Sequence, residues 1–347
     1  MGCAVRLRGP ILSIFPVAPL KNSRPEKDFT IVVDPDAPPL RLRGAVVAIG
    51  NFDGVHRGHA AVLQRARAVA TRLGRICAVL TFEPHPSDFF FGAGTIFRLT
   101  PSETKAAALA RIGIDAMIVL RFDAQLAALT PEEFIRDVLV RRLAVGGVVA
   151  GYDFHFGKGR AGTPATLLEA GTRYGFLVEI VERIATDASG SIEPASSTAT
   201  RQALEAGDVE RAHILLGHPY FVIGKVLHGE RHGKGLGFPT ANLRLDPSVR
   251  LRHGIYAVEV EIGDKRYGGV ASFGTRPTFD DGAPLLEVFI FDFSGDLYGK
   301  TIDVAFVGFL RDEEKFASPE ELVAQMRRDA EKARTLLSGG PPPPKSI

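Results

Sequence analysis

The sequence predicts two folded units in series. The first is an α/β domain on a doubly wound parallel sheet, and the second is an antiparallel β-barrel with a terminal helix. Three observations support this fold class. The 347 residues suffice for two domains of ordinary size. Apolar runs alternate with helical patterns over residues 45–217, and short strand-like runs then follow one another without intervening helices.

The composition is that of an ordinary globular protein and argues against several function classes. Hydrophobic residues make up 45% and charged residues 24%, and 42 basic against 40 acidic side chains give a formal net charge of +2. This near balance disfavours a nucleic-acid or membrane-surface binder. Cys3 and Cys77 match neither a zinc pattern nor a disulfide framework, so we expect a reducing, cytoplasmic location. No apolar run of about 18 residues predicts a membrane span.

Residues 1–43 are expected to form a partly disordered leader. Residues 5–20 faintly resemble a signal peptide, with Arg6 and Arg8 ahead of an apolar stretch. Three prolines interrupt that stretch. We therefore interpret it as a leader, or as the product of an upstream start codon, rather than as an export signal.

Five runs predict the strands of the first domain. Each is almost wholly apolar, which suits a strand buried on both faces of a parallel sheet. The runs are Ala45–Gly50, Ile76–Phe82, Met117–Phe122, Val145–Gly151 and Phe176–Ile184. Strands that alternate with helices predict a crevice at the carboxyl ends of the strands.

Helices are expected between these strands. One apolar repeat at helical spacing ends before Gly74, a residue suited to stop a helix: it consists of Val62, Ala66, Val69 and Leu73. Thr100–Glu103 and Thr130–Glu133 each have the pattern of a capping box with proline at the first helical position.

The most specific motif of the first domain follows the strand that ends at Gly50. Residues 51–59 read Asn-Phe-Asp-Gly-Val-His-Arg-Gly-His and lead directly into a helix. Such a turn offers free N–H groups and the helix dipole to an anion, and Gly58 permits close backbone approach. His56 and His59 share a helical face and can donate hydrogen bonds to a polyphosphate, each worth roughly 3–4 kcal/mol. Two surface histidines on a capped helix are the alternative, and the His-x-Gly-His spacing favours function.

Two further segments are expected at the same crevice. Ser197, Thr198 and Arg201 open a helix, where the hydroxyls either cap the helix or hold phosphates, with Arg201 as a bidentate clamp. Gly151–Arg160 follows a predicted strand. There Phe154 and Phe156 can contact a planar ring, or they pack as ordinary loop aromatics.

Together these segments resemble the adenylylation module of bacterial bifunctional riboflavin kinase/FAD synthetases. That module is Rossmann-like and belongs to the nucleotidyltransferases with an HxGH signature. The resemblance rests on Gly50–His59, Pro84-His85-Pro86, Asp153–Gly157, and Ser197 and Thr198 with Arg201. Thr200 and Ser87 depart from the pattern, since the family usually has an aliphatic residue and an arginine there.

The resemblance implies a role for each matching residue. His56 and His59 would stabilise the ATP phosphates and the transition state, as catalytic residues. The residues expected to bind ATP or the leaving pyrophosphate are Gly50, Asn51, Gly58, Ser197, Thr198 and Arg201. Those expected to bind the flavin are Asp153, Phe154, Phe156 and Arg160.

The runs after Gly217 predict an antiparallel barrel, because closely spaced strands without helices favour one. They are Tyr220–His228, Ile255–Ile262, Tyr267–Phe273, Leu285–Phe293 and Thr301–Phe309. Gly263-Asp264 and Ser294-Gly295-Asp296 are typical of hairpin turns. A helix capped at Ser318 closes the chain, and we expect the proline-rich residues 339–347 to be disordered.

Two features of the barrel carry chemistry. In the glycine-rich segment Gly229–Asn242, backbone N–H groups around Lys234 and Gly235 can form an anion nest. Thr240 and Asn242 supply oxygen ligands suited to Mg²⁺, and a flexible loop is the alternative. Glu287 shares a strand face with Phe289 and Phe291. It can be a general base toward an alcohol, worth roughly 10²–10⁴ in rate, or half of a structural ion pair.

These segments resemble the riboflavin kinase module of the same family. The matches are Pro239–Asn242, Gly274–Thr278, the strand with Glu287, and Asp296–Gly299. The resemblance implies that Thr240 and Asn242 bind Mg-ATP, with Lys234 and Gly235 at the phosphates, and that Glu287 deprotonates the ribityl 5′-hydroxyl. It also places Arg311 in a flavin-side loop. Ser272 and Phe289 depart from the pattern, where asparagine and histidine are usual.

The two resemblances cover nearly all of residues 45–337 and imply an enzyme with two Mg²⁺- and ATP-dependent steps. Residues 44–217 would adenylylate FMN to FAD, and residues 218–338 would phosphorylate riboflavin to FMN. We expect riboflavin, FMN and ATP as ligands, with transient flavin delivery to apo-flavoproteins and no nucleic-acid or membrane partner. Two alternatives remain: a single-activity HxGH nucleotidyltransferase acting on another phosphorylated substrate, and a flavin-binding regulator with inactive sites.

Overall fold

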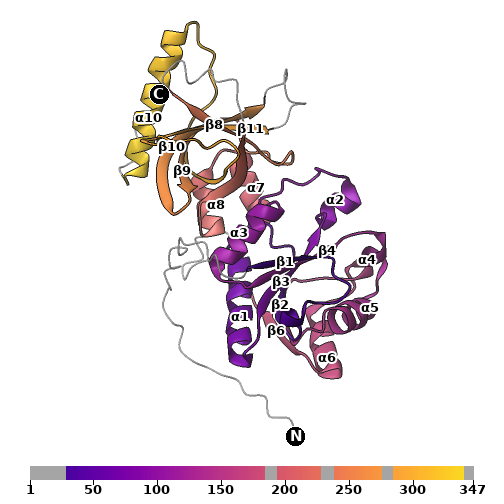
Figure 1. Ribbon diagram of the computed structural model, residues 1–347. Helices are drawn as coiled ribbons and strands as arrows, with labels where there is room; N and C mark the ends of the chain where they lie inside the picture. The colour runs from indigo at the N-terminus through magenta and orange to yellow at the C-terminus, as the bar shows by residue number, and fades with distance from the viewer. Residues whose placement is uncertain (1–28, 184–193, 228–237, 276–283, 340–347) are drawn as a thin grey trace, which may run out of the picture.

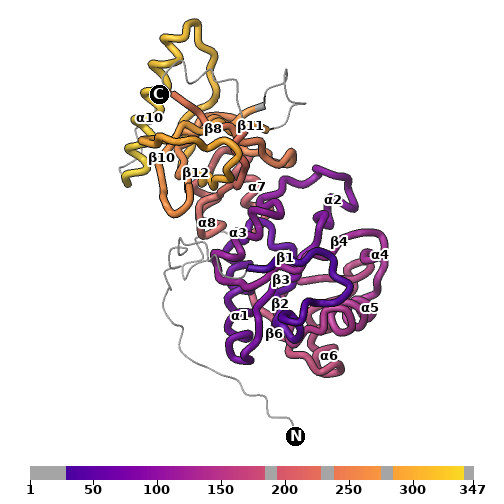
Figure 2. The backbone as a smooth tube through the Cα atoms, in the orientation of Figure 1, coloured from indigo at the N-terminus to yellow at the C-terminus, as the bar shows by residue number. Residues whose placement is uncertain are grey.

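The computed structural model describes residues 29–183, 194–227, 238–275 and 284–339, and it confirms the predicted fold class (Figure 1). An α/β unit and a β-barrel lie end to end. Helices α7 (Ser197–Glu205) and α8 (Val209–Leu216) lie between them (Figures 1 and 2).

The α/β unit is built on a six-stranded parallel sheet with the strand order β1-β4-β3-β2-β5-β6. Five strands match the predicted runs: β2 (Val46–Ile49), β3 (Cys77–Glu83), β4 (Ala116–Arg121), β5 (Gly147–Gly151) and β6 (Leu177–Val181). Ile184, the end of the last predicted run, lies outside the described residues. The sixth strand, β1 (Thr30–Val33), was not predicted; it lies within the expected leader and pairs with β4. Its apolar run, Ile31–Val33, is only three residues long, and its side chains alternate between half-buried and exposed, as in an edge strand.

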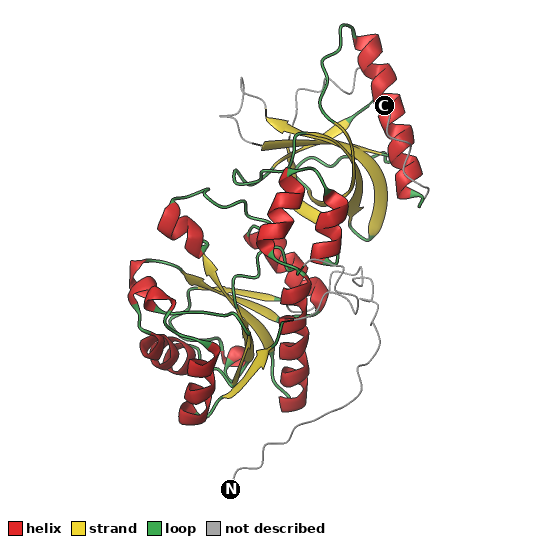
Figure 3. Cartoon of the chain, turned by 180° about the vertical axis from the view of Figure 1, so that it is seen from behind, coloured by secondary structure: helices red, strands yellow, loops and turns green. Residues whose placement is uncertain are grey.

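Helices cover both faces of this sheet (Figure 3). One face packs against α1 (Arg57–Leu73) and α3 (Ser102–Ile112). The other packs against the π-helical segment η2 (Phe134–Arg142), which continues α5 (Pro131–Glu133), and against α6 (Pro164–Tyr174). The remaining elements are short: α2 (Pro86–Phe91), α4 (Ala124–Ala128), η1 (Leu40–Leu42) and η3 (Lys158–Arg160).

Three predicted helix signals have different outcomes. Gly74 ends α1 in the left-handed conformation with a φ of 62°, as expected. Thr130 forms the predicted capping box with Glu133. The capping box predicted at Thr100 is wrong, because α3 has no side-chain cap and the Thr100 hydroxyl instead accepts the N–H of Gly54 at 2.8 Å.

The second unit is a closed six-stranded barrel with the strand order β10-β11-β8-β7-β12-β9. Its strands are β7 (Tyr220–Leu227), β8 (Thr240–Arg244), β9 (Gly254–Ile262), β10 (Lys265–Thr275), β11 (Pro284–Ile290) and β12 (Thr301–Arg311). Strand β8, at the end of the glycine-rich segment, was not among the predicted runs. Helix α10 (Pro319–Leu337) packs on the outside of the barrel, mainly against β9, β10 and β12.

One predicted hairpin exists and the other does not. Gly263 and Asp264 join the antiparallel neighbours β9 and β10. The hairpin predicted at Ser294–Asp296 is wrong, because β11 pairs with β8 and β10, whereas β12 pairs with β7 and β9. The segment therefore crosses between strands that are not neighbours.

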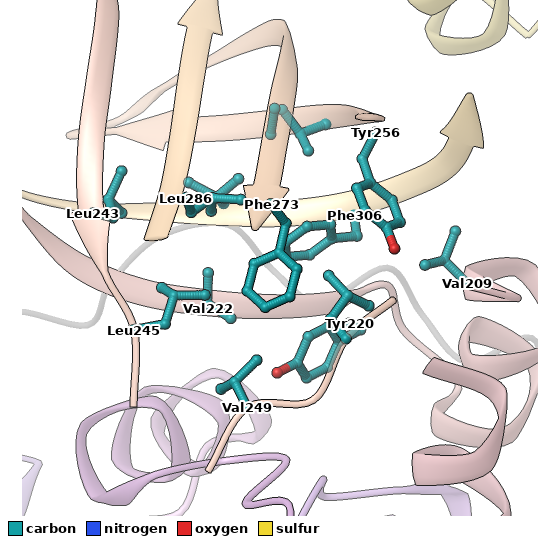
Figure 4. Close-up of a cluster of buried hydrophobic side chains, with 14 of the residues drawn as sticks. Val209, Tyr220, Val222, Leu243, Leu245, Val249, Tyr256, Phe273, Leu286 and Phe306 are labelled. Atoms are coloured by element: carbon teal, nitrogen blue, oxygen red, sulfur yellow. The ribbon is translucent and has the colours of Figure 1, made fainter. Parts of the chain in front are cut away.

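The barrel core extends into the connecting helices. Figure 4 shows Val209 of α8 at the edge of the cluster formed by Tyr220, Phe273 and Phe306. The same core takes in further side chains from α7 and α8: Ala199, Ala203, Leu204, Ala212, Leu215 and Leu216. Phe97 and Leu99, from the α/β unit, also belong to it. The two units therefore share packed residues.

Candidate active sites

A pocket of about 1440 Å³ opens at the carboxyl ends of the parallel strands, where the sequence predicted a crevice. Single-ligand pockets measure roughly 300–1,000 Å³, so this one has room for two ligands. All twelve residues predicted for the first site line it: Gly50, Asn51, His56, Gly58, His59, Asp153, Phe154, Phe156, Arg160, Ser197, Thr198 and Arg201. The fold therefore brings the predicted segments together.

The two histidines form a stacked pair at the start of α1. Their ring centroids are 3.6 Å apart with an interplanar angle of 18°. His56 caps the helix, and its Nδ1 accepts the backbone N–H of His59 at 3.3 Å, which places the proton of the neutral His56 ring on Nε2. A Cβ at Gly58 would lie 3.1 Å from Cε1 of His56, so glycine leaves room for this ring.

Both imidazoles are neutral near pH 7. Burial lowers the pKa of His56 to about 4, although the Asp53 carboxylate opposes this shift. Burial, together with His56, holds the pKa of His59 well below its usual value. Each ring therefore offers one N–H donor without carrying a positive charge.

We expect acidification from pH 6.5 toward pH 4 to lower the free energy of unfolding. In this range His56 of the unfolded chain binds a proton that His56 of the folded chain does not, so protonation stabilises the unfolded state. Each such imidazole contributes roughly 1.4 kcal/mol per pH unit. Urea unfolding at pH 7 and pH 5 measures the loss, and His56→Asn should reduce it. If His56→Asn lost as much stability as the wild-type chain, the pH dependence would not come from His56. The control is His253→Asn, at an exposed position.

The turn before α1 is strained. Phe52 and Val55 have φ values of 49° and 44°, in the left-handed region that non-glycine residues and above all β-branched ones avoid. Such strain persists only where surrounding contacts hold it, and it concentrates at functional sites. Two hydrogen bonds of 2.8 Å hold this turn. The N–H of Gly54 donates to the Thr100 hydroxyl, and the Ser197 hydroxyl donates to the carbonyl of Asp53.

Arg201 reaches the pocket from α7 and is paired with Asp53. Its Nη2 lies 2.5 Å from Oδ2 of Asp53, and its Nε donates to the carbonyl of Phe97 at 2.7 Å. Burial alone raises the pKa of Asp53, but the Arg201 charge and the N–H of Thr100 hold it below its usual value. Ser196, rather than Ser197, caps α7. The Ser197 hydroxyl and the exposed Thr198 are therefore not used as the helix cap.

Two groups of aromatic side chains contribute to the pocket. Phe154 and Phe156 stack with centroids 5.6 Å apart, but Phe156 is buried in the core against Phe134. Phe90 and Phe91 on α2 were not predicted for the site, but they line the pocket and are 62% and 76% exposed. Large exposed apolar side chains often mark binding surfaces, and the run of three phenylalanines was the available signal.

The barrel brings three of the predicted kinase residues, Glu287, Thr240 and Asn242, onto one outward face. Glu287 on β11 lies directly opposite Asn242 on β8 and Ser272 on β10, and Thr240 lies opposite Phe289. Glu287, Thr240 and Asn242 are all half-buried. Lys234 and Gly235 lie outside the described residues.

Arg311, expected near the flavin, is engaged elsewhere in this structure. Its Nη2 lies 2.8 Å from Oδ2 of the buried Asp329 on α10, and its Nη1 donates to the carbonyl of Asp312 at 2.8 Å. The ion pair with Asp329 connects the end of β12 to α10. A flavin contact by Arg311 stays a prediction.

The donor atoms of the barrel face fit a hard cation. Among the described residues, no group of three His, Cys, Asp or Glu side chains is placed to hold a metal ion. Mg²⁺ binds through few protein oxygens together with substrate phosphates and water. The oxygens of Thr240 and Asn242 would suit that arrangement.

Comparisons with known proteins identify both modules of the chain. A family model described as FAD synthetase matches residues 39–198, and one described as riboflavin kinase matches residues 216–337. The bifunctional riboflavin kinase/FMN adenylyltransferase of Escherichia coli K12 is 43% identical over 85% of this chain and 93% of its own length. The chain belongs to the bifunctional riboflavin kinase/FMN adenylyltransferase family. Further members from Haemophilus influenzae (40% identical, 86% of this chain, 96% of theirs) and Bacillus subtilis (38%, 85%, 93%) are similar over comparable lengths.

One solved structure has a fold similar to that of the present chain. It is titled a macrolide-efflux protein from Streptococcus pneumoniae, with a TM-score of 0.74 and 32% identity over 88% of this chain and 99% of that one. Within the described ranges of the present chain, no helix is both long and apolar enough to cross a membrane.

The four residues that depart from the expected family pattern lie in helix α7, at the strand-end pocket and on the barrel face. Thr200 is fully buried, and its hydroxyl donates to the carbonyl of Ser196 at 2.9 Å, so the polar group is satisfied within α7. Ser87 lines the pocket, where its N–H donates to Nδ1 of His85. Ser272 faces Glu287, and the Phe289 ring contacts Phe238 at 4.9 Å.

Proposed function

We propose that this chain phosphorylates riboflavin to FMN and adenylylates FMN to FAD, using ATP in both steps, at two separate sites. The observation that supports it most is the placement of the motifs. The stacked histidines, Ser197 and Arg201 converge on the strand-end pocket, whereas Glu287 and Asn242 face each other on the barrel. We further propose residues 44–217 and 218–338 as the respective catalytic units.

In the adenylylation step, a phosphate oxygen of FMN attacks the α-phosphorus of ATP and pyrophosphate leaves. The nucleophile is already anionic, so the site needs hydrogen-bond donors rather than a base. Nε2–H of His56, a donor from His59 and the N-terminus of α1 supply them. Arg201, Ser197 and Thr198 would bind the departing pyrophosphate.

In the kinase step, the ribityl 5′-hydroxyl attacks the γ-phosphorus of ATP. We assign Glu287 as the base that accepts the hydroxyl proton, and Thr240 and Asn242 as the residues that hold Mg-ATP. When bound, Mg²⁺ would neutralise the triphosphate charge in both sites. Asn242 directly opposite Glu287 would place the nucleotide beside the base.

The flavin in the adenylylation site would lie along the aromatic wall of the pocket. Phe154 and the exposed Phe90 and Phe91 offer apolar faces to its ring, while Asp153 and Arg160 offer polar contacts. We place the enzyme in the cytoplasm and expect it to pass flavins transiently to apo-flavoproteins.

One experiment separates this function from its alternatives. The purified chain is incubated with riboflavin, ATP and Mg²⁺, and the flavins are separated chromatographically over time. We expect FMN first and FAD later, and FAD alone when FMN is supplied. A single-activity nucleotidyltransferase would leave riboflavin unchanged, and an inactive regulator would leave both flavins unchanged.

The shared core gives a prediction about fragments. We expect residues 196–339 to convert riboflavin to FMN without making FAD, and to unfold at a higher temperature than residues 219–339. The shorter fragment lacks Leu204, Leu215 and Leu216, each at most 2% exposed. Each such leucine contributes roughly 1.5–3 kcal/mol, so the loss reaches several kcal/mol. Equal melting temperatures would contradict the packing of α7 and α8 on the barrel, and a folded but inactive longer fragment would contradict the assignment of the kinase.

A further inference from the structure

Asp53 lies in the first motif, yet no step of the mechanism above uses it. It is only 1% exposed. Its Oδ1 accepts the N–H of Thr100 at 2.9 Å, and its Oδ2 accepts the N–H of Leu99 at 3.2 Å as well as Nη2–H of Arg201 at 2.5 Å. A buried carboxylate is costly unless it is paired and hydrogen-bonded, as this one is.

The contacts of Arg201 leave part of its guanidinium for a ligand. A guanidinium has five N–H bonds in a rigid fork. The carbonyl of Phe97 takes the one on Nε, and Asp53 takes one on Nη2. Two on Nη1 and a second on Nη2 are not used by these contacts. Two fixed points on a planar group define its orientation, so Asp53 can aim the remaining fork without occupying it.

The charges around Asp53 are balanced in number. Arg98 lies 2.5 Å from Glu83 and 3.7 Å from Asp88, and the fully buried Lys105 lies 3.4 Å from Glu83. With the pair of Asp53 and Arg201, three cations face three carboxylates. Loss of the Asp53 charge would leave Arg201 beside two further cations without its own counter-ion.

The backbone that holds Asp53 is anchored in the other unit. Leu99 donates its N–H to Asp53 and Phe97 accepts from Arg201, while the side chains of both belong to the barrel core. Arg98 between them donates its N–H to the hydroxyl of Ser248, on the barrel side, at 3.1 Å. The backbone that contacts Asp53 and Arg201 is therefore held partly by the barrel.

We propose that Asp53 is a positioning residue that orients the Arg201 guanidinium toward the pyrophosphate portion of ATP and touches no substrate itself. The inference rests on the proposed role of Arg201 in adenylylation. The competing possibility is that Asp53 only stabilises the turn through the N–H groups of Leu99 and Thr100. A double-mutant cycle distinguishes the two, because a residue that acts through Arg201 has no role left once Arg201 is removed.

The experiment uses the full chain and four variants: Asp53→Asn, Arg201→Ala, the double variant and Glu83→Gln. FAD formation from supplied FMN gives the KM for ATP and the inhibition constant of inorganic pyrophosphate. Riboflavin phosphorylation by the same samples reports folding. Glu83→Gln is the matched control, because it removes one carboxylate from the same cluster without contacting Arg201.

We expect Arg201→Ala and Asp53→Asn each to raise the KM for ATP and the pyrophosphate inhibition constant by roughly tenfold or more. Adding Asp53→Asn to Arg201→Ala should then change them by less than about twofold. Glu83→Gln should have a much smaller effect than Asp53→Asn.

Three outcomes would overturn the proposal. If Asp53→Asn had an equal effect in the wild-type chain and in Arg201→Ala, Asp53 would act independently of Arg201. Asp53→Asn that lowers riboflavin phosphorylation and FAD formation together would show a structural role. An unaffected Arg201→Ala would remove the assigned role of Arg201, and only this outcome also counts against the proposed function of the site.

A second variant keeps the test decisive if Asp53→Asn does not fold. Arg201→Lys keeps the charge and leaves Asp53 an ion-pair partner, but it replaces the oriented fork with a single ammonium group. If orientation is what Asp53 provides, this variant should lose nearly as much pyrophosphate affinity as Arg201→Ala. Retained affinity would overturn the proposal.

Discussion

FMN formation should fall by roughly 10²–10⁴-fold in the Glu287→Gln variant, because glutamine keeps the shape and hydrogen bonding of the side chain but cannot accept the hydroxyl proton. The affinities for riboflavin and Mg-ATP should change little, since a base acts chiefly in the transition state. FAD formation from supplied FMN should persist, because we assign that chemistry to the strand-end pocket of the α/β unit. Single-turnover FMN formation measures the effect.

Thermal unfolding of the same sample separates catalysis from structure. If Glu287 were half of a structural ion pair, Glu287→Gln would unfold earlier, although its half-exposed position keeps that cost small. Glu259→Gln is the matched control, since Glu259 is a half-buried barrel carboxylate 3.8 Å from Arg266, outside the proposed site. A Glu287→Gln variant with normal stability and normal phosphorylation would remove Glu287 from the mechanism.

FAD formation should fall by roughly 10²–10³-fold in the His59→Ala variant, while FMN formation persists. The variant loses a donor from the stacked pair but keeps the backbone N–H that His56 accepts. The cap of α1 therefore survives, and the loss reports on chemistry rather than on the start of the helix. FAD formation from supplied FMN at saturating ATP measures it.

The control for this variant is His213→Ala, on α8 and outside the pocket, which should make FAD at the normal rate. Riboflavin phosphorylation by His59→Ala confirms that the chain is folded. Unchanged FAD synthesis would reduce His59 to a packing residue beneath Phe52, whose ring centroid lies 5.2 Å away.

The sequence by itself determined the features that depend on near neighbours along the chain. Apolar runs gave five of the six parallel strands, and Gly74 gave the end of α1. The His-x-Gly-His spacing predicted the shared face of His56 and His59, because the helical repeat fixes which side chains meet. The resemblance of short motifs then identified both modules. Each motif is a short contiguous segment, so its residues can be recognised without knowledge of the fold.

Only the tertiary structure decided the features that join distant segments. Asp53 and Arg201 are 148 residues apart, and the structure alone shows that Asp53 pairs with the predicted clamp. Thr100 has a cap-like sequence, but its hydroxyl is used at the turn of the first motif. Strand β11 is followed by a hairpin-like sequence, yet barrel closure gives it neighbours other than β12. At Thr100 a capping preference worth about 1 kcal/mol is outweighed by contacts with the turn of the first motif, and at β11 the closure of the barrel outweighs a local turn preference.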